Sequence, residues 1–160
     1  MSYIRVWIHA VWGTKNREHF LTRGLRPRVF SHIRENATQK EIYIDRLNGH
    51  TDHVHCLFGL NADMTIAKML QLIKGESAYW INKEKMALGK FEWANEYYAV
   101  SVSESVLDTV RAYIDNQEEH HKRRRSLKKW KSSCKSITFR VMAKAGLCFV
   151  GEVPHHEWWG

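Results

Sequence analysis

The sequence predicts one α+β domain, in which an antiparallel sheet carries two helices on one face and a third helix on the other. Short stretches of alternating apolar and polar residues, typical of strands, occur between stretches with apolar residues at helical spacing. The order along the chain is strand, helix, strand, strand, helix, strand, helix. A length of 160 residues, of which 44% are hydrophobic, is enough for a single core.

The chain begins with a predicted strand and a predicted helix. Residues 3–12 alternate, so one face of the strand is formed by Tyr3, Arg5, Trp7, His9 and Val11. A loop follows, and residues 25–40 have the spacing of a helix with Val29 and Ile33 inward. Pro27 suits the first turn of this helix, where its missing N–H costs nothing.

A hairpin is predicted next. Residues 41–47 form its first strand, Asn48-Gly49 starts the turn, and residues 53–60 form its second strand. The apolar face of the second strand consists of Val54, Cys56, Phe58 and Leu60. This face should lie beneath the first two helices.

Residues 65–83 repeat apolar side chains at helical spacing and predict an amphipathic helix, with Thr65 or Asp63 as its cap. Gly75 inside this helix costs about 1 kcal/mol relative to alanine, which hints at close packing.

Residues 97–102 predict the fourth strand, and a helix then runs from 105 to about Arg124. Ser105 to Asp108 has the form of a capping box at its start. The first six elements have the split β-α-β-β-α-β order of ferredoxin-like (RRM-like) folds. The last helix is then expected to cover the face of the sheet that the other two leave open.

Two histidines lie on that open face of the predicted strand 53–60. His53 and His55 alternate with apolar residues, so they lie side by side, roughly 6–7 Å apart along the strand. Imidazole is a common ligand of divalent ions, and this spacing lets both rings bind one ion. A third ligand must come from elsewhere in the chain. Polar residues on a solvated face are the plainer interpretation of such a pair.

The predicted last helix offers candidates for the rest of a site. Tyr113 and Gln117 are four residues apart and share one face, while the packing stripe is formed by Val106, Leu107, Val110 and Ile114. If this helix meets the histidine face, Gln117 can give a third ligand through its amide oxygen. Tyr113 then lies within reach of whatever the metal holds. A tyrosine on an amphipathic helix is more often part of a core.

The charge of the chain is concentrated at its end. The formal net charge is +8, which suggests a polyanionic partner. Residues from His120 onward hold ten Lys/Arg against two acids, whereas residues 1–119 hold fifteen of each. We therefore divide the chain into a domain over 1–125 and a basic tail over 126–160. No apolar run predicts a membrane span, and three distant cysteines suggest a reducing cytoplasm.

Taken together, these motifs resemble a known family. Asp52-His53-Val54-His55, followed by Lys74-Gly75-Glu76-Ser77 and later by Tyr113-x-x-x-Gln117, is similar to the single-tyrosine HUH transposases. These are small insertion-sequence-200-like enzymes, in which HUH denotes His, a bulky hydrophobe and His. The resemblance covers roughly residues 3–124.

The resemblance implies a metal-dependent endonuclease and strand transferase that acts on single-stranded DNA with hairpins. His53, His55 and Gln117 would bind Mg²⁺ or Mn²⁺, and Tyr113 would attack a phosphate to form a 5′-phosphotyrosine. Asp52 would not bind the metal itself but would support the residues that do. The family also implies a homodimer in which the tyrosine helix of one subunit completes the site of the other.

Further residues are candidates for DNA contacts. Lys15 and Arg17 would contact phosphates, and the start of the basic stretch adds Lys122, Arg123, Arg124 and Arg125. Three aromatic residues would either stack on unpaired bases or pack in the core, namely Trp93, Tyr97 and Tyr98.

Two alternatives remain open for the function. A domesticated REP-associated tyrosine transposase would cut chromosomal hairpins without mobilising its own element. A non-catalytic RRM-like module would bind RNA, but it would need aromatic residues in place of His53 and His55. A bare zinc site is disfavoured, because no cysteine or third histidine has ligand spacing near the pair.

The tail departs from the family pattern. Relatives follow the tyrosine helix with an amphipathic helix that contains glutamates, whereas residues 126–137 contain no acid. Either this stretch belongs to a basic arm that binds phosphates, or it has been translated out of the ancestral reading frame by two insertions or deletions that compensate each other. The second alternative would leave a weakened or dead transposase, despite an intact set of His53, His55, Tyr113 and Gln117.

Overall fold

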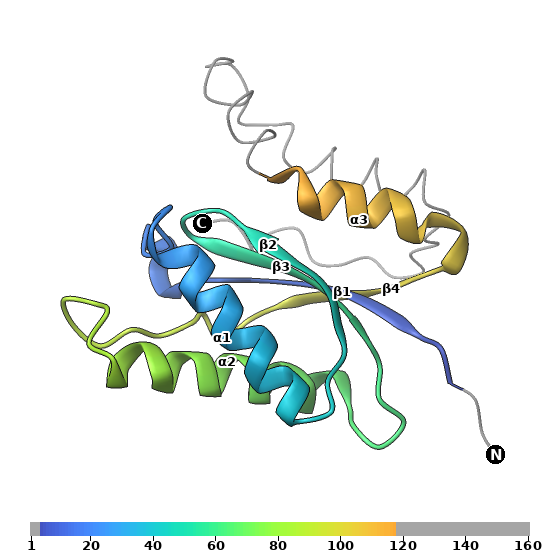
Figure 1. Ribbon diagram of the computed structural model, residues 1–160, viewed down its shortest axis with the longest axis horizontal. Coiled ribbons are helices and arrows are strands. Elements are labelled where there is room, and N and C mark those ends of the chain that lie inside the picture. Colours follow the sequence, from blue (N-terminus) through green and yellow to red (C-terminus); the bar gives the residue numbers. More distant parts are fainter. Residues whose placement is uncertain (1–3, 118–160) are drawn as a thin grey trace.

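The computed structural model describes residues 4–117, and the sheet in this part of the chain has the strand order β2-β3-β1-β4. Neighbouring strands are antiparallel, and the strands are β1 (Trp7–Gly13), β2 (Ile44–Gly49), β3 (His53–Gly59) and β4 (Tyr98–Val102). Helices α1 (Leu25–Gln39) and α2 (Ile66–Lys83) cover one face, and α3 (Leu107–Asp115) lies across the other (Figure 1). The predicted α+β, ferredoxin-like arrangement is confirmed.

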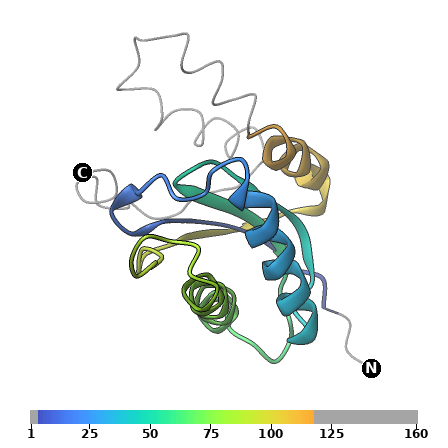
Figure 2. The same ribbon diagram turned by 60° about the vertical axis from the view of Figure 1, so that its left-hand side comes forward.

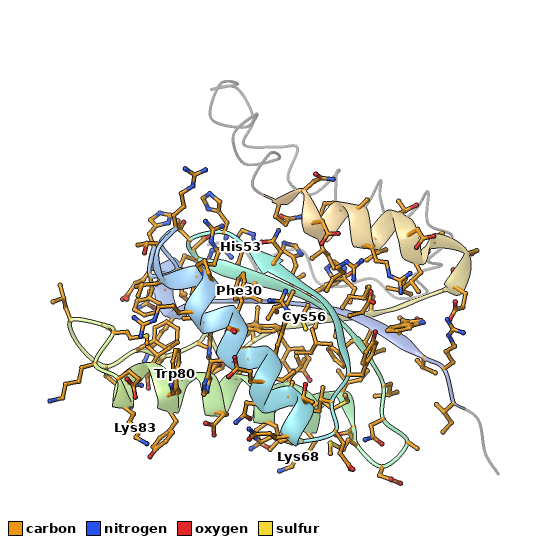
Figure 3. All side chains as sticks on the ribbon, in the orientation of Figure 1. Phe30, His53, Cys56, Lys68, Trp80 and Lys83 are labelled. Carbon is orange, nitrogen blue, oxygen red and sulfur yellow. The ribbon has the colours of Figure 1, made fainter. Side chains whose placement is uncertain are left out.

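The larger apolar layer lies between the sheet and the helices α1 and α2. The predicted alternation is confirmed, because the sheet contributes Ile8, Ala10, Trp12, Val54, Cys56 and Phe58 to this layer. Figure 3 labels Phe30 of α1 and Cys56 of β3, two members of the same layer. The turned view of Figure 2 shows α3 on the opposite side of the sheet from α1 and α2.

A second apolar layer attaches α3 to the other face. Leu107, Val110 and Ile114 are buried there, and they pack against Trp7, Leu57 and Val102 of the sheet. Burying one such aliphatic side chain contributes about 1.5–3 kcal/mol. The stripe predicted from the spacing is therefore the face by which α3 is held.

Polar side chains of β2 also hold α3. Arg111 donates two hydrogen bonds to the carboxylate of Asp45, from Nε at 2.7 Å and from Nη2 at 3.2 Å. The amide of Asn48 donates to the carbonyl oxygens of Ile114 and Asp115 at the end of the helix, at 2.9 and 3.1 Å. These bonds satisfy carbonyls that a helix end leaves without partners.

The predicted start of this helix was wrong. Ser105 caps nothing, because a short 3₁₀ turn, η2 (Glu104–Val106), precedes α3 and no side chain caps its first residue. Within the described residues α3 runs to Asp115, where the Asn48 amide donates to its last carbonyls, and the predicted end near Arg124 stays a prediction. Residues 118–124 of the predicted helix lie outside the described residues.

The hairpin turn is also displaced from its predicted position. Asn48 and Gly49 are the last residues of β2 and pair with His55 and Val54, so the turn is made by residues 50–52. The helix over 65–83 is confirmed, and Thr65 accepts a hydrogen bond from the Lys68 N–H. The close packing suggested for Gly75 was wrong, because a Cβ there would meet only open space.

Candidate active site

The two histidines of β3 lie side by side, as the alternation predicts. Their ring centroids are 5.2 Å apart, and only 8% of His53 and 6% of His55 is exposed. They lie on the face of the sheet that α3 covers, opposite to the layer that contains Val54 and Cys56. Figure 3 labels His53 at the end of the sheet near α3. The plainer interpretation of a solvated pair is therefore wrong.

The hairpin is held so that His53 starts β3 at a fixed place. Gly49 lies so close to the returning strand that a Cβ there would be 2.2 Å from the carbonyl oxygen of His53, which only glycine allows. The backbone N–H of Thr14 donates to the Asp52 carbonyl at 2.9 Å, so the end of β1 is tied to the turn.

Asp52 connects His53 to a basic residue of another loop. Its Oδ1 is 2.7 Å from Nδ1 of His53, and its Oδ2 is 2.9 Å from Nη2 of Arg17. Although burial by itself raises the pKa of Asp52, the hydrogen bond with His53 and nearby positive charges such as Arg17 lower it to about 2. The carboxylate is therefore charged at neutral pH.

Arg17 reaches Asp52 from an unusual turn. The 3₁₀ turn η1 (Lys15–Arg17) places Asn16 and Arg17 at φ 54° and 59°, in the left-handed region. Non-glycine residues adopt this region at a cost of about 1–3 kcal/mol, and such positions cluster at functional sites. The turn thus directs a guanidinium onto the carboxylate behind His53.

Tyr113 comes from the last turn of α3 and faces the histidines. Its ring meets that of His55 edge to face, with centroids 5.6 Å apart and planes at 84°. It also lies edge-on to His9, at 6.2 Å. The predicted meeting of the tyrosine helix with the histidine face is confirmed within one chain.

Gln117 follows α3 and is 2% exposed. Its Nε2 donates to the backbone carbonyl of Tyr113 at 3.0 Å, so the amide oxygen is the atom suited to bind a cation. Within residues 4–117, no three His, Cys, Asp or Glu side chains are arranged to hold a metal. A metal on His53 and His55 would therefore need another kind of ligand, and the Gln117 amide is of that kind.

His9 is a residue of this site to which the sequence motifs gave no role. It is 4% exposed, and its Nε2 lies 3.2 Å from Nδ1 of His55. Burial lowers the pKa of His9 to about 4, so its ring is neutral at pH 7. The alternation of residues 3–12 already placed His9 on one face with Trp7, but the register with β3 could not be read from the sequence.

The predicted phosphate contacts have partners within the protein. Lys15 forms an ion pair with Glu92, and its side chain remains 58% exposed. The Arg17 side chain is 47% exposed while it binds Asp52. Their roles in DNA binding stay predictions. Lys122, Arg123, Arg124 and Arg125 lie outside the described residues, as does the tail over 126–160.

The three aromatic candidates for base stacking differ from one another. Trp93 is 6% exposed within the larger apolar layer and donates to Ser77 Oγ at 2.9 Å, so it is a core residue. Tyr97 packs partly against the same layer, with the Lys74 ammonium 5.7 Å from its ring centroid. Tyr98 is partly buried on β4 and pairs with Val11.

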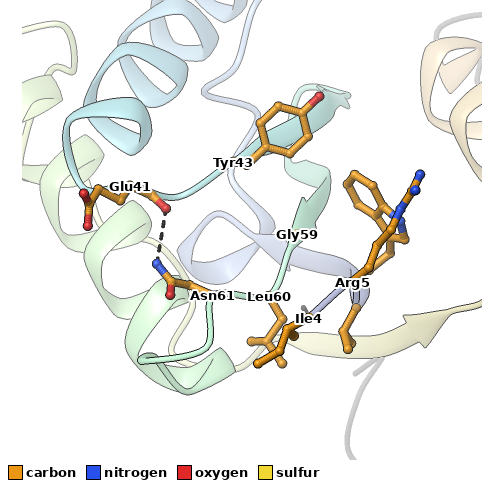
Figure 4. A pocket seen from close by; sticks show the side chains of 9 residues that line it. Ile4, Arg5, Glu41, Tyr43, Gly59, Leu60 and Asn61 are labelled. Carbon is orange, nitrogen blue, oxygen red and sulfur yellow. Dashed lines mark hydrogen bonds between the residues drawn. The ribbon is translucent and has the colours of Figure 1, made fainter. Parts of the chain in front are cut away.

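A pocket of about 260 Å³ lies at the opposite end of β3 (Figure 4). Its lining includes Arg5, Tyr43 and Gly59, and the Asn61 amide donates to the Glu41 carbonyl at 3.4 Å beside it. Because His53 starts β3 and Gly59 ends it, this pocket is separate from the histidine site.

Comparison with known proteins identifies the class. Residues 2–117 match the family described as Transposase IS200 like, so the chain belongs to this family and is a transposase. No curated protein matches the chain. Within residues 4–117, no helix combines the length and the apolar composition that crossing a membrane requires.

Two solved structures are similar to this chain. One is a candidate transposase from Deinococcus radiodurans, with 26% identity and a TM-score of 0.60, covering 72% of this chain and 93% of its own. The other is a REP-associated tyrosine transposase bound to a REP hairpin, with 15% identity and a TM-score of 0.55. That match covers 98% of this chain and 93% of the other, and it supports the fold.

Proposed function

We propose that this transposase cuts and rejoins single-stranded DNA through Tyr113, with Mg²⁺ or Mn²⁺ held by His53, His55 and Gln117. The observation that carries the proposal is the edge-to-face contact between Tyr113 and His55. A tyrosine hydroxyl and two nearly buried imidazoles on one small face suit nucleophilic attack beside a cation.

The donor set fits a divalent cation. His53 uses Nδ1 toward Asp52 and His55 uses Nδ1 toward His9, so in both rings Nε2 is the nitrogen suited to a metal. Metal-binding histidines commonly use their second nitrogen in this way, often toward a carboxylate. When bound, the cation would polarise the scissile phosphodiester and offset the charge that develops on it.

The residues of the chain account for the covalent step. The Tyr113 oxygen forms a bond to phosphorus and loses its proton to solvent, and the bond from phosphorus to the 3′ oxygen breaks. The released 3′ oxygen takes up a proton, and the 5′ phosphate stays on Tyr113. In rejoining, a 3′-hydroxyl attacks the phosphotyrosine and Tyr113 leaves. One ester replaces another, so no nucleotide cofactor is needed.

The DNA class is proposed from the neighbours as well as from the site. The REP-associated transposase is bound to a hairpin, which supports single-stranded DNA with hairpins as the partner here. The same neighbour favours a second candidate, a domesticated transposase that cuts chromosomal hairpins. Genomic context separates the two, because several copies with flanking hairpins would mark a mobile element.

A non-catalytic RNA-binding module is less well supported. Such a module would present aromatic residues on the open face of its central strands. Here β3 presents His53 and His55 on that face, and α3 packs over Leu57 of the same strand.

Labelled single-stranded DNA from the flanks of the gene tests the proposal. With Mg²⁺ or Mn²⁺ we expect a shorter labelled strand with a 3′-hydroxyl and a covalent protein–DNA band, and both should vanish with chelator. DNA binding that is equal with and without metal, and without any cleavage of several hairpin substrates, would instead support the binding module.

A further inference from the structure

His9 occupies a place on β1 that the family motifs do not explain. In the β1–β3 register it stands opposite Leu57, two residues beyond His55 on the same face. Alternate residues share a face, so His9 and His55 are diagonal neighbours across the strand pair. A polar ring that is 4% exposed in such a place needs a hydrogen-bond partner.

The partner of His9 is a ring that the proposed metal site uses. Nε2 of His9 lies 3.2 Å from Nδ1 of His55, and the two rings stack at 19° with centroids 5.4 Å apart. A hydrogen bond between two imidazoles needs one N–H and one bare nitrogen. A cation on Nε2 of His55 requires the proton of that ring to be on Nδ1, which then donates to His9.

We propose that His9 is a positioning residue, whose Nε2 accepts a hydrogen bond from Nδ1 of His55 and fixes the tautomer and ring orientation that present Nε2 to the metal. This inference rests on the proposed function, because His55 is a ligand of the proposed site. His9 thereby does for His55 what Asp52 does for His53 through its bond of 2.7 Å.

His9 is not itself a member of the ligand set. Among the described residues no three His, Cys, Asp or Glu side chains are arranged to hold a metal, and Nε2 of His9 faces Nδ1 of His55. The role assigned to His9 therefore lies in the bond with His55.

The tautomer of His55 can be measured without metal, DNA or any variant that alters the site. In the full-length protein labelled with ¹⁵N-histidine, two-dimensional NMR near neutral pH should show a proton on Nδ1 of His55 and a bare Nε2. The opposite tautomer, with the proton on Nε2, would overturn the proposal.

Metal affinity provides the second arm. His9→Phe keeps a ring but removes the acceptor, and His9→Gln places an amide oxygen close to the position of Nε2. We expect His9→Phe to bind Mn²⁺ about 10–100-fold more weakly than wild type, by paramagnetic resonance of free Mn²⁺, while His9→Gln stays close to wild type. A merely structural role would not separate the two variants in this way.

The remaining outcomes also decide the matter. Equal affinity in His9→Phe, or equal weakness in both variants, would overturn the role of His9. If His9→Phe does not fold, the tautomer of His55 in the wild-type protein decides whether the proposal holds. Wild-type protein that binds no Mn²⁺ and forms no DNA adduct, whichever tautomer it has, would overturn the proposed function and this inference with it. If wild-type protein binds Mn²⁺ and His9→Phe binds it equally well, only the role of His9 is overturned and the proposed function stands.

Discussion

At the scale of single residues, the two histidines of β3 are held by different means. His53 is oriented by the adjacent carboxylate of Asp52, which Arg17 binds from a loop, whereas His55 is oriented by His9 of the neighbouring strand. Both arrangements restrict rotation of the rings before any ligand arrives. Such preorganisation helps a metal site to bind a cation for which its ligands have only a weak affinity.

Replacing each proposed metal-binding side chain by alanine should distinguish strong metal ligands from weak ones. His53→Ala and His55→Ala should each abolish metal-dependent cleavage and Mn²⁺ binding. Gln117→Ala should reduce both less, because a neutral amide is a weaker ligand that water can replace. Cleavage rates and Mn²⁺ binding of the purified variants provide the measurement.

The matched control for these variants is His32→Ala, since His32 lies on α1 at the opposite side of the sheet, stacked on Trp80. Its Mn²⁺ binding should equal that of wild type. Cleavage by wild type that persists unchanged in chelator would contradict the metal model.

The sequence predicts much of this site but not all of it. The spacing of His53, His55 and Tyr113 was sufficient to predict which face of the strand or helix each side chain occupies, because strand and helix periodicities determine those faces. His9 required the β1–β3 register, a long-range property that no local pattern encodes. Of the two alternatives left open for Trp93, core packing is the one found, with a hydrogen bond to Ser77 sixteen residues away in the chain.

At the scale of elements, the position of Tyr113 depends on how α3 is fixed to β2. Arg111 binds two carboxylates, those of Asp45 and Asp108, but the environments differ. The Asp45 side chain is 6% exposed and lies across the sheet–helix boundary, whereas that of Asp108 is 95% exposed on the helix itself. Only the first of these ion pairs connects two elements.

We therefore expect Asp45→Asn to lower the cleavage rate by about tenfold or more, since misplacing reacting groups by about 1 Å can cost up to about 100-fold. Asp108→Asn is the control and should change the rate little, because an exposed pair within one helix contributes little. Single-turnover cleavage, with DNA binding measured alongside, provides the comparison. Equal rates for the two variants would show that the Asp45 contact does not position α3.

The hairpin before His53 offers a second test at this scale. Gly49→Ala places a methyl group against the His53 carbonyl and should destabilise the protein by about 1–3 kcal/mol or more in urea unfolding. Gly75→Ala, in open space on α2, should instead stabilise it by about 0.5–1 kcal/mol. Opposite signs are expected, and a neutral Gly49→Ala would show that the hairpin is held less tightly than described.

Element types were predicted better than their ends. The strands and helices follow from periodicity, which is a local property. The end of β2 was displaced because Asn48 does not turn the chain but donates to the carbonyls of Ile114 and Asp115 in α3, which are 66 and 67 positions away. Such tertiary contacts override the local preference of Asn-Gly for a turn.

At the scale of the whole molecule, the described chain brings Tyr113 to its own His55. The family resemblance led us to expect a homodimer with sites shared between subunits, and this stays a prediction. Sharing would require α3 to leave Asp45 and Asn48 of its own β2 and to make the equivalent contacts on a partner.

Mixing two inactive proteins tests the sharing of sites. Tyr113→Phe and His53→Ala are combined under conditions in which subunits exchange. If subunits share sites, the mixed dimer has one complete site and recovers up to about half of the wild-type activity per heterodimer. No recovery, with heterodimers verified by mass, would assign each site to a single chain.

The most direct test of the account is to locate the covalent bond between protein and DNA. After reaction of a single-stranded hairpin substrate with Mn²⁺, protease digestion and mass spectrometry should find a 5′-phosphorylated nucleotide on the peptide that contains Tyr113. Tyr113→Phe should bind the same DNA, form no adduct and release no 3′-hydroxyl, whereas the control Tyr43→Phe, at a residue 62% exposed near the other end of β3, should react as wild type. An adduct on another residue, or cleavage by Tyr113→Phe at the wild-type rate, would contradict the assignment of Tyr113 as the nucleophile.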